Sequence, residues 1–76
     1  MNLLDEVIGV IAKVLNVSAS ELNEDTSIGD IPAWDSLHQV MIINALEQHF
    51  NIRFEPEVIL DLEDVSDIVA AIEERK

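Results

Sequence analysis

Apolar residues recur with the period of an α-helix at both ends of this chain, and this pattern constrains the fold more than any other feature. In residues 3–15 the apolar side chains fall within an arc of roughly 160° when residues are placed at 100° intervals, with the charged residues outside it. Residues 65–72 repeat the pattern, ahead of the basic pair Arg75 and Lys76, with apolar positions at Val65, Ile68, Val69 and Ile72. Both segments are predicted to be amphipathic helices that share a core.

The centre of the chain predicts two further helices. Residues 37–50 contain no Gly or Pro, Asp35 is available as an N-cap, and the helix is expected to end near Asn51. Residues 55–62 place Pro56 in a first helical turn and predict a short helix. No strand is predicted, because the sequence contains no run in which β-branched residues alternate with polar ones. The expected fold is all-α, a four-helix bundle of three longer helices and one short helix, with a long loop between the first two.

Size and charge limit the organisation and the partners. The 76 residues predict a single domain, 1–76, and the 49% apolar content is enough for one core. With 16 acidic against 4 basic residues the net charge is −12, so nucleic acid and anionic membrane surfaces are excluded as expected partners. There is no cysteine, and acidic residues stand where a signal peptide needs positive charge. We expect a cytoplasmic monomer without membrane insertion.

A stretch of about twenty residues, NVSASELNEDTSIGDIPAWD, separates the first two long helices and is longer than most connectors in compact domains. Ser18 and Glu21 have the spacing of a capping box for one isolated turn. Four apolar residues are expected to anchor the loop to the core: Leu22, Ile28, Ile31 and Trp34. The loop leads the chain to Ser36, within the segment PAWDSLHQV.

A hydrolytic role for Ser36 is not supported by its neighbours. His38 is two residues away, and on a helix such residues point about 200° apart, so the ring cannot reach the Ser36 hydroxyl. The strained G-x-S-x-G turn of many serine hydrolases is absent. We therefore predict that the chain is not an enzyme.

A calcium loop is also not supported. Asn23, Asp25 and Ser27 alternate as the first ligands of an EF-hand would. The pattern then fails, because Ile28 occupies the position of the turn glycine and Trp34 that of the bidentate glutamate. The prediction is no metal site beyond diffuse attraction of cations to the acidic surface.

The residues around Ser36 leave two roles open. Asp35 or Ser36 could serve only as a helix cap, the commonest role of such residues. Alternatively, the free N–H groups of a helix N-terminus favour an anion, so a phosphate-linked group on the Ser36 hydroxyl is compatible with this position, although the charge of Asp35 opposes it.

The helix that begins at Ser36 has two apolar faces, whereas a small domain has one core. The first face is expected in the core and consists of Ile42, Ile43, Leu46 and Phe50. The second lies beside Ser36 and consists of Leu37, Val40 and Met41, with Glu47 on the same side. This second face is either an exposed docking surface or is covered by the long loop.

With these features together, the chain resembles an acyl carrier protein over essentially all of its 76 residues. The resemblance rests on WDSL at the start of the second long helix, ALEQHFNIRF leading into the short helix, and DVSDIVAAI in the last helix. It implies that Ser36 is esterified by a 4′-phosphopantetheinyl group from coenzyme A, whose thiol carries an acyl chain as a thioester. The implied partners are a phosphopantetheinyl transferase and acyl-loading and acyl-processing enzymes.

The resemblance also implies roles for residues near Ser36. Asp35 and Leu37 complete the motif read by the transferase, and Val40, Met41 and Glu47 lie on the helix presented to partners. Gln39 is placed to line the mouth of an acyl pocket. Candidate pocket walls, which fit an ordinary core better, are Ile43, Leu46, Ile59, Leu62 and Ile68.

The chain departs from the family pattern in where its acidic residues lie. Fatty-acid-synthesis members usually carry several acids on the second helix, whereas Glu47 is the only acid in residues 36–50. Six acids instead occupy residues 55–67: Glu55, Glu57, Asp61, Glu63, Asp64 and Asp67. This departure predicts a carrier for a specialised lipid, polyketide-like or polysaccharide-modifying pathway. The alternative is a small acidic helical interaction module that binds partners non-covalently through Leu37, Val40 and Met41.

Overall fold

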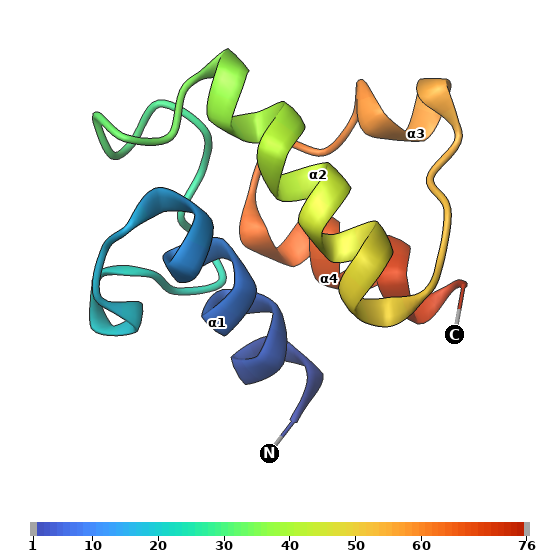
Figure 1. Cartoon of the computed structure of the whole chain (residues 1–76), viewed down its shortest axis with the longest axis horizontal. Coiled ribbons are helices and arrows are strands. Elements are labelled where there is room, and N and C mark those ends of the chain that lie inside the picture. The colour runs from blue at the N-terminus through green and yellow to red at the C-terminus, as the bar shows by residue number, and fades with distance from the viewer. Residues whose placement is uncertain (1, 76) are drawn as a thin grey trace.

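The computed structural model describes residues 2–75, which form four α-helices and one short 3₁₀ helix (Figure 1). Within these residues there is no strand, and the one isolated antiparallel bridge pairs Ser27 with Asp64. The predicted all-α bundle of three longer helices and one short helix is confirmed, while Lys76 lies outside the described residues. The elements are α1 (Leu3–Leu15), η1 (Ala19–Glu21), α2 (Ser36–Phe50), α3 (Pro56–Ile59) and α4 (Val65–Glu73).

Asparagine and aspartate side chains cap the N-terminal ends of the three longer helices. Asn2, Asp35 and Asp64 each accept the backbone N–H of the residue three positions later, at 2.8, 2.9 and 2.8 Å. These caps satisfy N–H groups that have no partner within the helix. Asn16 and Asn51 end α1 and α2 in the left-handed conformation, with φ of 58° and 56°. The predicted end of α2 near Asn51 is therefore confirmed.

The core forms where α1 packs against both α2 and α4. Its largest wholly buried side chain belongs to Trp34, at the end of the long loop. Leu22 is also buried, whereas Ile28 and Ile31 are half-buried, so the four expected anchors all contact the core to different extents. The wholly buried residues of the helices are Val7, Ile11, Ile42, Leu46, Val65, Ile68 and Ile72.

The long loop is ordered because it pairs with the segment that leads into α4. The Ile28 N–H donates to the Glu63 carbonyl at 2.9 Å, and the Val65 N–H donates to the Thr26 carbonyl at 3.0 Å. Gly29 has a φ of 90°, a conformation that side chains rarely allow, and its N–H donates to the Trp34 carbonyl at 2.8 Å. The loop thereby holds Trp34 in the core directly before α2 begins.

The predicted capping box is also present at η1. The Ser18 N–H donates to the Glu21 carboxylate at 3.1 Å, and the Ser18 hydroxyl accepts from the Ser20 N–H at 3.4 Å. The single turn therefore has its own local polar contacts.

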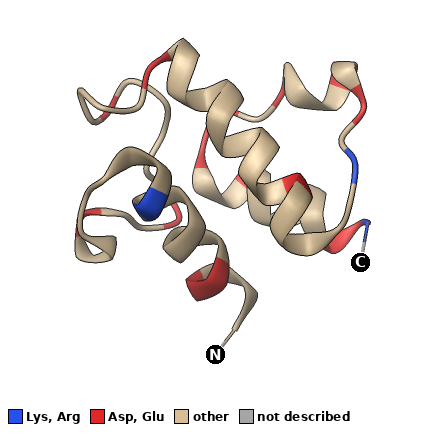
Figure 2. Ribbon diagram, in the orientation of Figure 1, with Lys and Arg blue, Asp and Glu red and all other residues tan. Residues whose placement is uncertain are grey.

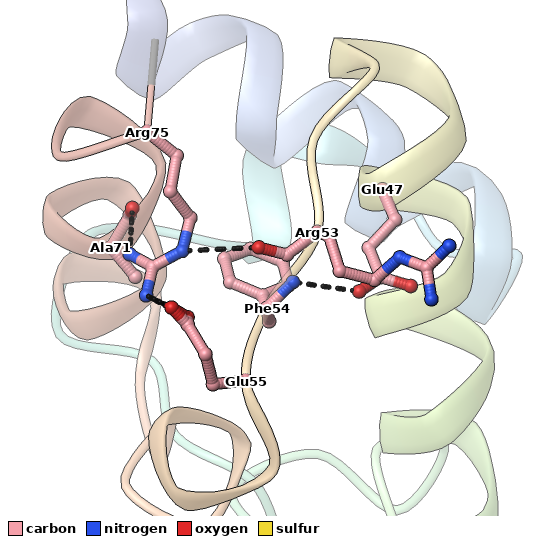
Figure 3. Close-up of polar contacts among 6 residues, drawn as sticks. All are labelled: Glu47, Arg53, Phe54, Glu55, Ala71 and Arg75. Carbon is pink, nitrogen blue, oxygen red and sulfur yellow. Dashed lines mark hydrogen bonds and ion pairs between the residues drawn. The ribbon is translucent and has the colours of Figure 1, made fainter.

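Arg75 holds the segment between α2 and α3 against the end of α4 (Figure 3). Its guanidinium donates to the carbonyls of Ala71 and Arg53 at 2.8 and 3.2 Å, and to both carboxylate oxygens of Glu55 at 2.6 and 3.1 Å. It also lies 5.5 Å from the centre of the Phe54 ring. The hydrogen bond from Arg75 holds the pKa of Glu55 below its ordinary value.

We expect Arg75→Lys to loosen residues 53–59, because an ammonium group is a compact charge and cannot reproduce the forked contacts of a guanidinium. Amide hydrogen exchange of this segment is expected to become on the order of tenfold faster. Arg53→Lys is the matched control, since Arg53 contributes its backbone carbonyl to these contacts. Equal exchange in the Arg75→Lys variant and the wild type would show that Arg75 does not hold the segment.

Candidate functional site

Ser36 is the first residue of α2, and its side chain is exposed. The cap of α2 is supplied by Asp35, whose carboxylate accepts the His38 N–H at 2.9 Å. Of the two residues predicted as possible caps, Asp35 is the one that caps α2, and the Ser36 hydroxyl takes no part in the cap. In Figure 1 the long loop reaches α2 at the upper end of this helix.

The side chain of His38 turns back to Asp35. Its Nδ1 lies 2.9 Å from the same Asp35 oxygen that accepts the His38 backbone N–H. The ring is thus turned toward Asp35, and within residues 2–75 no hydrogen bond joins it to the Ser36 hydroxyl, as a hydrolytic Ser36–His38 dyad would need. The backbone N–H of His38, followed by its ring, lowers the pKa of Asp35 below its ordinary value.

Because the pKa of Asp35 is lowered, its ionised carboxylate stabilises the folded state at pH values above the ordinary carboxyl pKa. This stabilisation is lost as the pH falls through the pKa that Asp35 has in the folded state. We expect the titration midpoint of Asp35, followed by carboxyl NMR shifts, to rise in His38→Ala but to stay below the ordinary value, because the backbone N–H remains. In Asp35→Asn the start of α2 should not respond to pH in this range. A wild-type midpoint at the ordinary value would contradict the account.

The second apolar face of α2 is exposed. Leu37, Val40 and Met41, called here the α2 patch, have 68, 66 and 47% of their surface accessible. The long loop therefore does not cover the patch. Leu60, directly after α3, is 83% exposed and was not predicted, because EVILDLED has no clear helical period by which to assign it a face.

A pocket of about 440 Å³ lies beside the patch and is lined mostly by α2. Ile43 of α2 and Ile59 of α3, two of the proposed walls, line it. The other three candidates, Leu46, Leu62 and Ile68, do not line it and belong to the buried core. The complete lining is Gln39, Val40, Met41, Ile43, Asn44, Glu47 and Ile59.

Gln39 lines the pocket, as expected for a residue at its mouth, but its side chain also makes two contacts that were not predicted. Its Oε1 accepts the indole N–H of Trp34 at 2.7 Å, and its Nε2 donates to the Leu62 carbonyl at 2.8 Å. The sequence signal was a polar residue at a core-facing angle near the only tryptophan. A buried indole N–H usually has an acceptor, so the pairing has a general physical basis.

Glu47, the only acidic residue of α2, is half-buried. Its carboxylate accepts the Phe54 N–H at 2.8 Å and so fixes the turn that follows α2 (Figure 3). Figure 2 shows the acidic residues spread over the loops and the other helices, while α2 is almost free of them. The α2 surface beside Ser36 therefore carries the apolar side chains of the α2 patch and little negative charge.

In residues 2–75 no helix has the length and apolar character needed to cross a membrane. In the same residues no three histidine, aspartate or glutamate side chains gather where they could hold a metal ion.

The comparisons with known proteins agree with this geometry. The family described as "Phosphopantetheine attachment site" matches residues 5–72. The acyl carrier proteins of Helicobacter pylori and Chlamydia caviae are each 38% identical, over all of this chain and 97 and 99% of their own lengths. The solution NMR structure of the holo acyl carrier protein from Geobacter metallireducens aligns with a TM-score of 0.87 and 31% identity, covering 99% of this chain and 86% of that one.

The fold and the exposed serine at the start of α2 define a small helical carrier with a phosphopantetheine attachment domain, and the chain belongs to the acyl carrier protein family. It is a carrier that bears acyl groups on a covalent 4′-phosphopantetheine arm and is not an enzyme. Its partners include a phosphopantetheinyl transferase and acyl-processing enzymes.

Proposed function

We propose that Ser36 is the attachment point of the phosphopantetheine arm. The observation that carries this proposal is an exposed serine hydroxyl at the first position of α2, with the helix cap supplied by the neighbouring Asp35. The N–H groups of the first turn of a helix have no partner in the preceding residues of the helix. The His38 N–H is used by Asp35, which leaves those of Ser36 and Leu37 for the phosphodiester.

The remaining site residues fit the arm in different ways. Asp35 and Leu37 flank Ser36 and are proposed to be read by the transferase. When bound, the arm supplies the thiol that carries the acyl group as a thioester. The pocket begins at Gln39, three residues or about 4.5 Å along the helix axis from Ser36, so an acyl chain can lie against Ile43 and Ile59.

We infer that the α2 patch presents the loaded arm to a dedicated set of enzymes. Val40 and Met41 are exposed, and Glu47, proposed as a further docking residue, already accepts the Phe54 N–H. Charged residues at the edge of a protein–protein interface mainly accelerate association and select partners. An apolar α2 patch therefore favours enzymes with an apolar docking surface. The proposed setting is a specialised lipid, polyketide-like or polysaccharide-modifying pathway.

Met41→Glu is expected to make the protein a better substrate for housekeeping fatty-acid enzymes, because it adds an acid where those carriers usually have one. We expect kcat/KM with such an enzyme to rise by on the order of tenfold at low salt, and the gain to shrink as salt is added. Gly9→Glu is the matched control, since it adds the same charge on the exposed side of α1. A Cβ added at Gly9 meets no atom within 4 Å. Efficient elongation of the wild-type protein by these enzymes would contradict the dedicated role.

The competing proposal, a module that binds only non-covalently, predicts a different pair of mutant results. Under the carrier proposal Ser36→Ala abolishes acyl transfer, whereas Val40→Glu weakens partner binding and leaves modification by coenzyme A measurable. Under the competing proposal Ser36→Ala retains function and Val40→Glu abolishes it. Measuring both variants for binding and for acyl transfer with one partner enzyme separates the two proposals.

A further inference from the structure

Gln39 is fixed at both ends of its side chain. It accepts the indole N–H of Trp34 at 2.7 Å and donates to the Leu62 carbonyl at 2.8 Å. Trp34 is wholly buried before α2, and Leu62 is 5% exposed in the segment between α3 and α4. One amide thus ties α2 to two segments that are distant in the sequence.

The same side chain forms part of the pocket wall. Ile43 and Ile59 also line the pocket, while Leu62, on the other side of the Gln39 contacts, does not. Gln39 lines the pocket and also hydrogen-bonds to both Trp34 and Leu62, so a chain that passes from the pocket to these residues at the position of the Gln39 amide displaces that amide.

Displacement of Gln39 has a specific energetic consequence. It would leave the Trp34 indole N–H without its acceptor in a position that water does not reach. Across residues 2–75, no buried side-chain nitrogen or oxygen now lacks a hydrogen-bond partner. Since an unpaired buried donor is costly, the amide resists displacement more strongly than an apolar side chain of similar size would.

We propose that Gln39 determines the length of acyl chain that this carrier can shelter. Short chains lie in the pocket against Ile43 and Ile59, and the distal part of a longer chain stays exposed to solvent. The inference rests on the proposed function, because it requires an acyl group delivered from Ser36. Under this proposal the chain-length specificity depends on Gln39 and on the hydrogen bond that Gln39 accepts from Trp34.

The test compares acyl chains of increasing length on the intact protein. Butyryl-, octanoyl- and palmitoyl-phosphopantetheine are transferred from the corresponding coenzyme A esters by a broad-specificity transferase, and intact mass verifies loading. Trp34 is the only tryptophan, so its indole N–H gives one NMR resonance that reports on Gln39. Retention on a hydrophobic-interaction column reports how much of the acyl chain stays exposed.

In the wild type we expect retention to increase from octanoyl to palmitoyl, with the Trp34 resonance unmoved in all three forms. In Gln39→Met the increase should be lost, and palmitoyl should shift the Trp34 resonance, because the chain now passes the methionine. Gln48→Met is the control on the exposed side of α2, where the Gln48 amide contacts only Asn44, at 3.4 Å, among the described residues. It should behave as the wild type does.

Identical retention series in Gln39→Met and the wild type would overturn the proposal, as would a palmitoyl-induced shift of Trp34 in the wild type. If Gln39→Met does not fold, Trp34→Phe provides the second test, because it removes the donor and should also abolish the palmitoyl increase. Absence of any acyl-phosphopantetheine in the mass spectrum would instead refute the attachment at Ser36. Normal loading with an unchanged chain-length series would refute only the role of Gln39.

Discussion

Ser36→Ala is expected to lose phosphopantetheine attachment completely while keeping the helical fold. The hydroxyl oxygen is the atom that would form the ester, and alanine offers no replacement. Because Ser36 is exposed and the cap belongs to Asp35, the free energy of unfolding should change by no more than about 0.5 kcal/mol. Time courses of modification by mass spectrometry and urea unfolding followed by circular dichroism measure the two effects separately.

Ser66→Ala provides a control for this prediction. Ser66 also lies in the first turn of a helix, α4, whose cap is an aspartate, Asp64. It differs from Ser36 in being the second residue of its helix, in donating its hydroxyl to Asp64 at 3.0 Å, and in lacking the DSL motif and the adjacent α2 patch. We expect Ser66→Ala to be modified at the wild-type rate, and modification of Ser36→Ala at any appreciable rate would show that another residue carries the arm.

Trp34→Ala is expected to have the largest effect on stability. Loss of a wholly buried tryptophan side chain typically costs about 3 to 5 kcal/mol. It also leaves Gln39 without its indole donor. For a chain of 76 residues the whole free energy of unfolding is roughly 4 to 11 kcal/mol, so this loss is a large fraction of it and the variant is expected to unfold at a much lower urea concentration than the wild type.

Urea unfolding of Trp34→Ala, followed by circular dichroism, measures this cost. Leu60→Ala is the contrasting variant, because Leu60 is a large apolar residue that is 83% exposed and its loss should cost less than about 0.5 kcal/mol. Similar unfolding midpoints for the two variants would show that Trp34 does not anchor the long loop to the core.

The three longer helices and their ends were predictable because the physical causes are local, whereas the short helix spans only Pro56–Ile59 of the predicted residues 55–62. Apolar periodicity predicted α1 and α4, Asp35 predicted the start of α2, and the absence of Gly and Pro predicted its length. The two apolar faces of α2 were also predictable from residue spacing. One face is buried in the core and the other, the α2 patch, is exposed.

The contacts between distant segments were not predictable, because nothing in the local sequence selects their partners. Arg75 was expected only as a basic residue near a helix end, yet it holds Arg53 and Glu55, which are 22 and 20 positions away. Gln39 pairs with a carbonyl at Leu62, an acceptor that every residue offers. Pocket walls were predicted only in part for the same reason, since the packing decides which apolar residues face the pocket.

The most direct test of the carrier account is the intact mass of the protein purified from its native cells, followed by fragmentation to locate any added group. The account predicts a covalent phosphopantetheine, with or without an acyl group, on the peptide that contains Ser36 and on no other. A protein of unmodified mass that still supports its cellular function, or an arm located on a different serine, would contradict it.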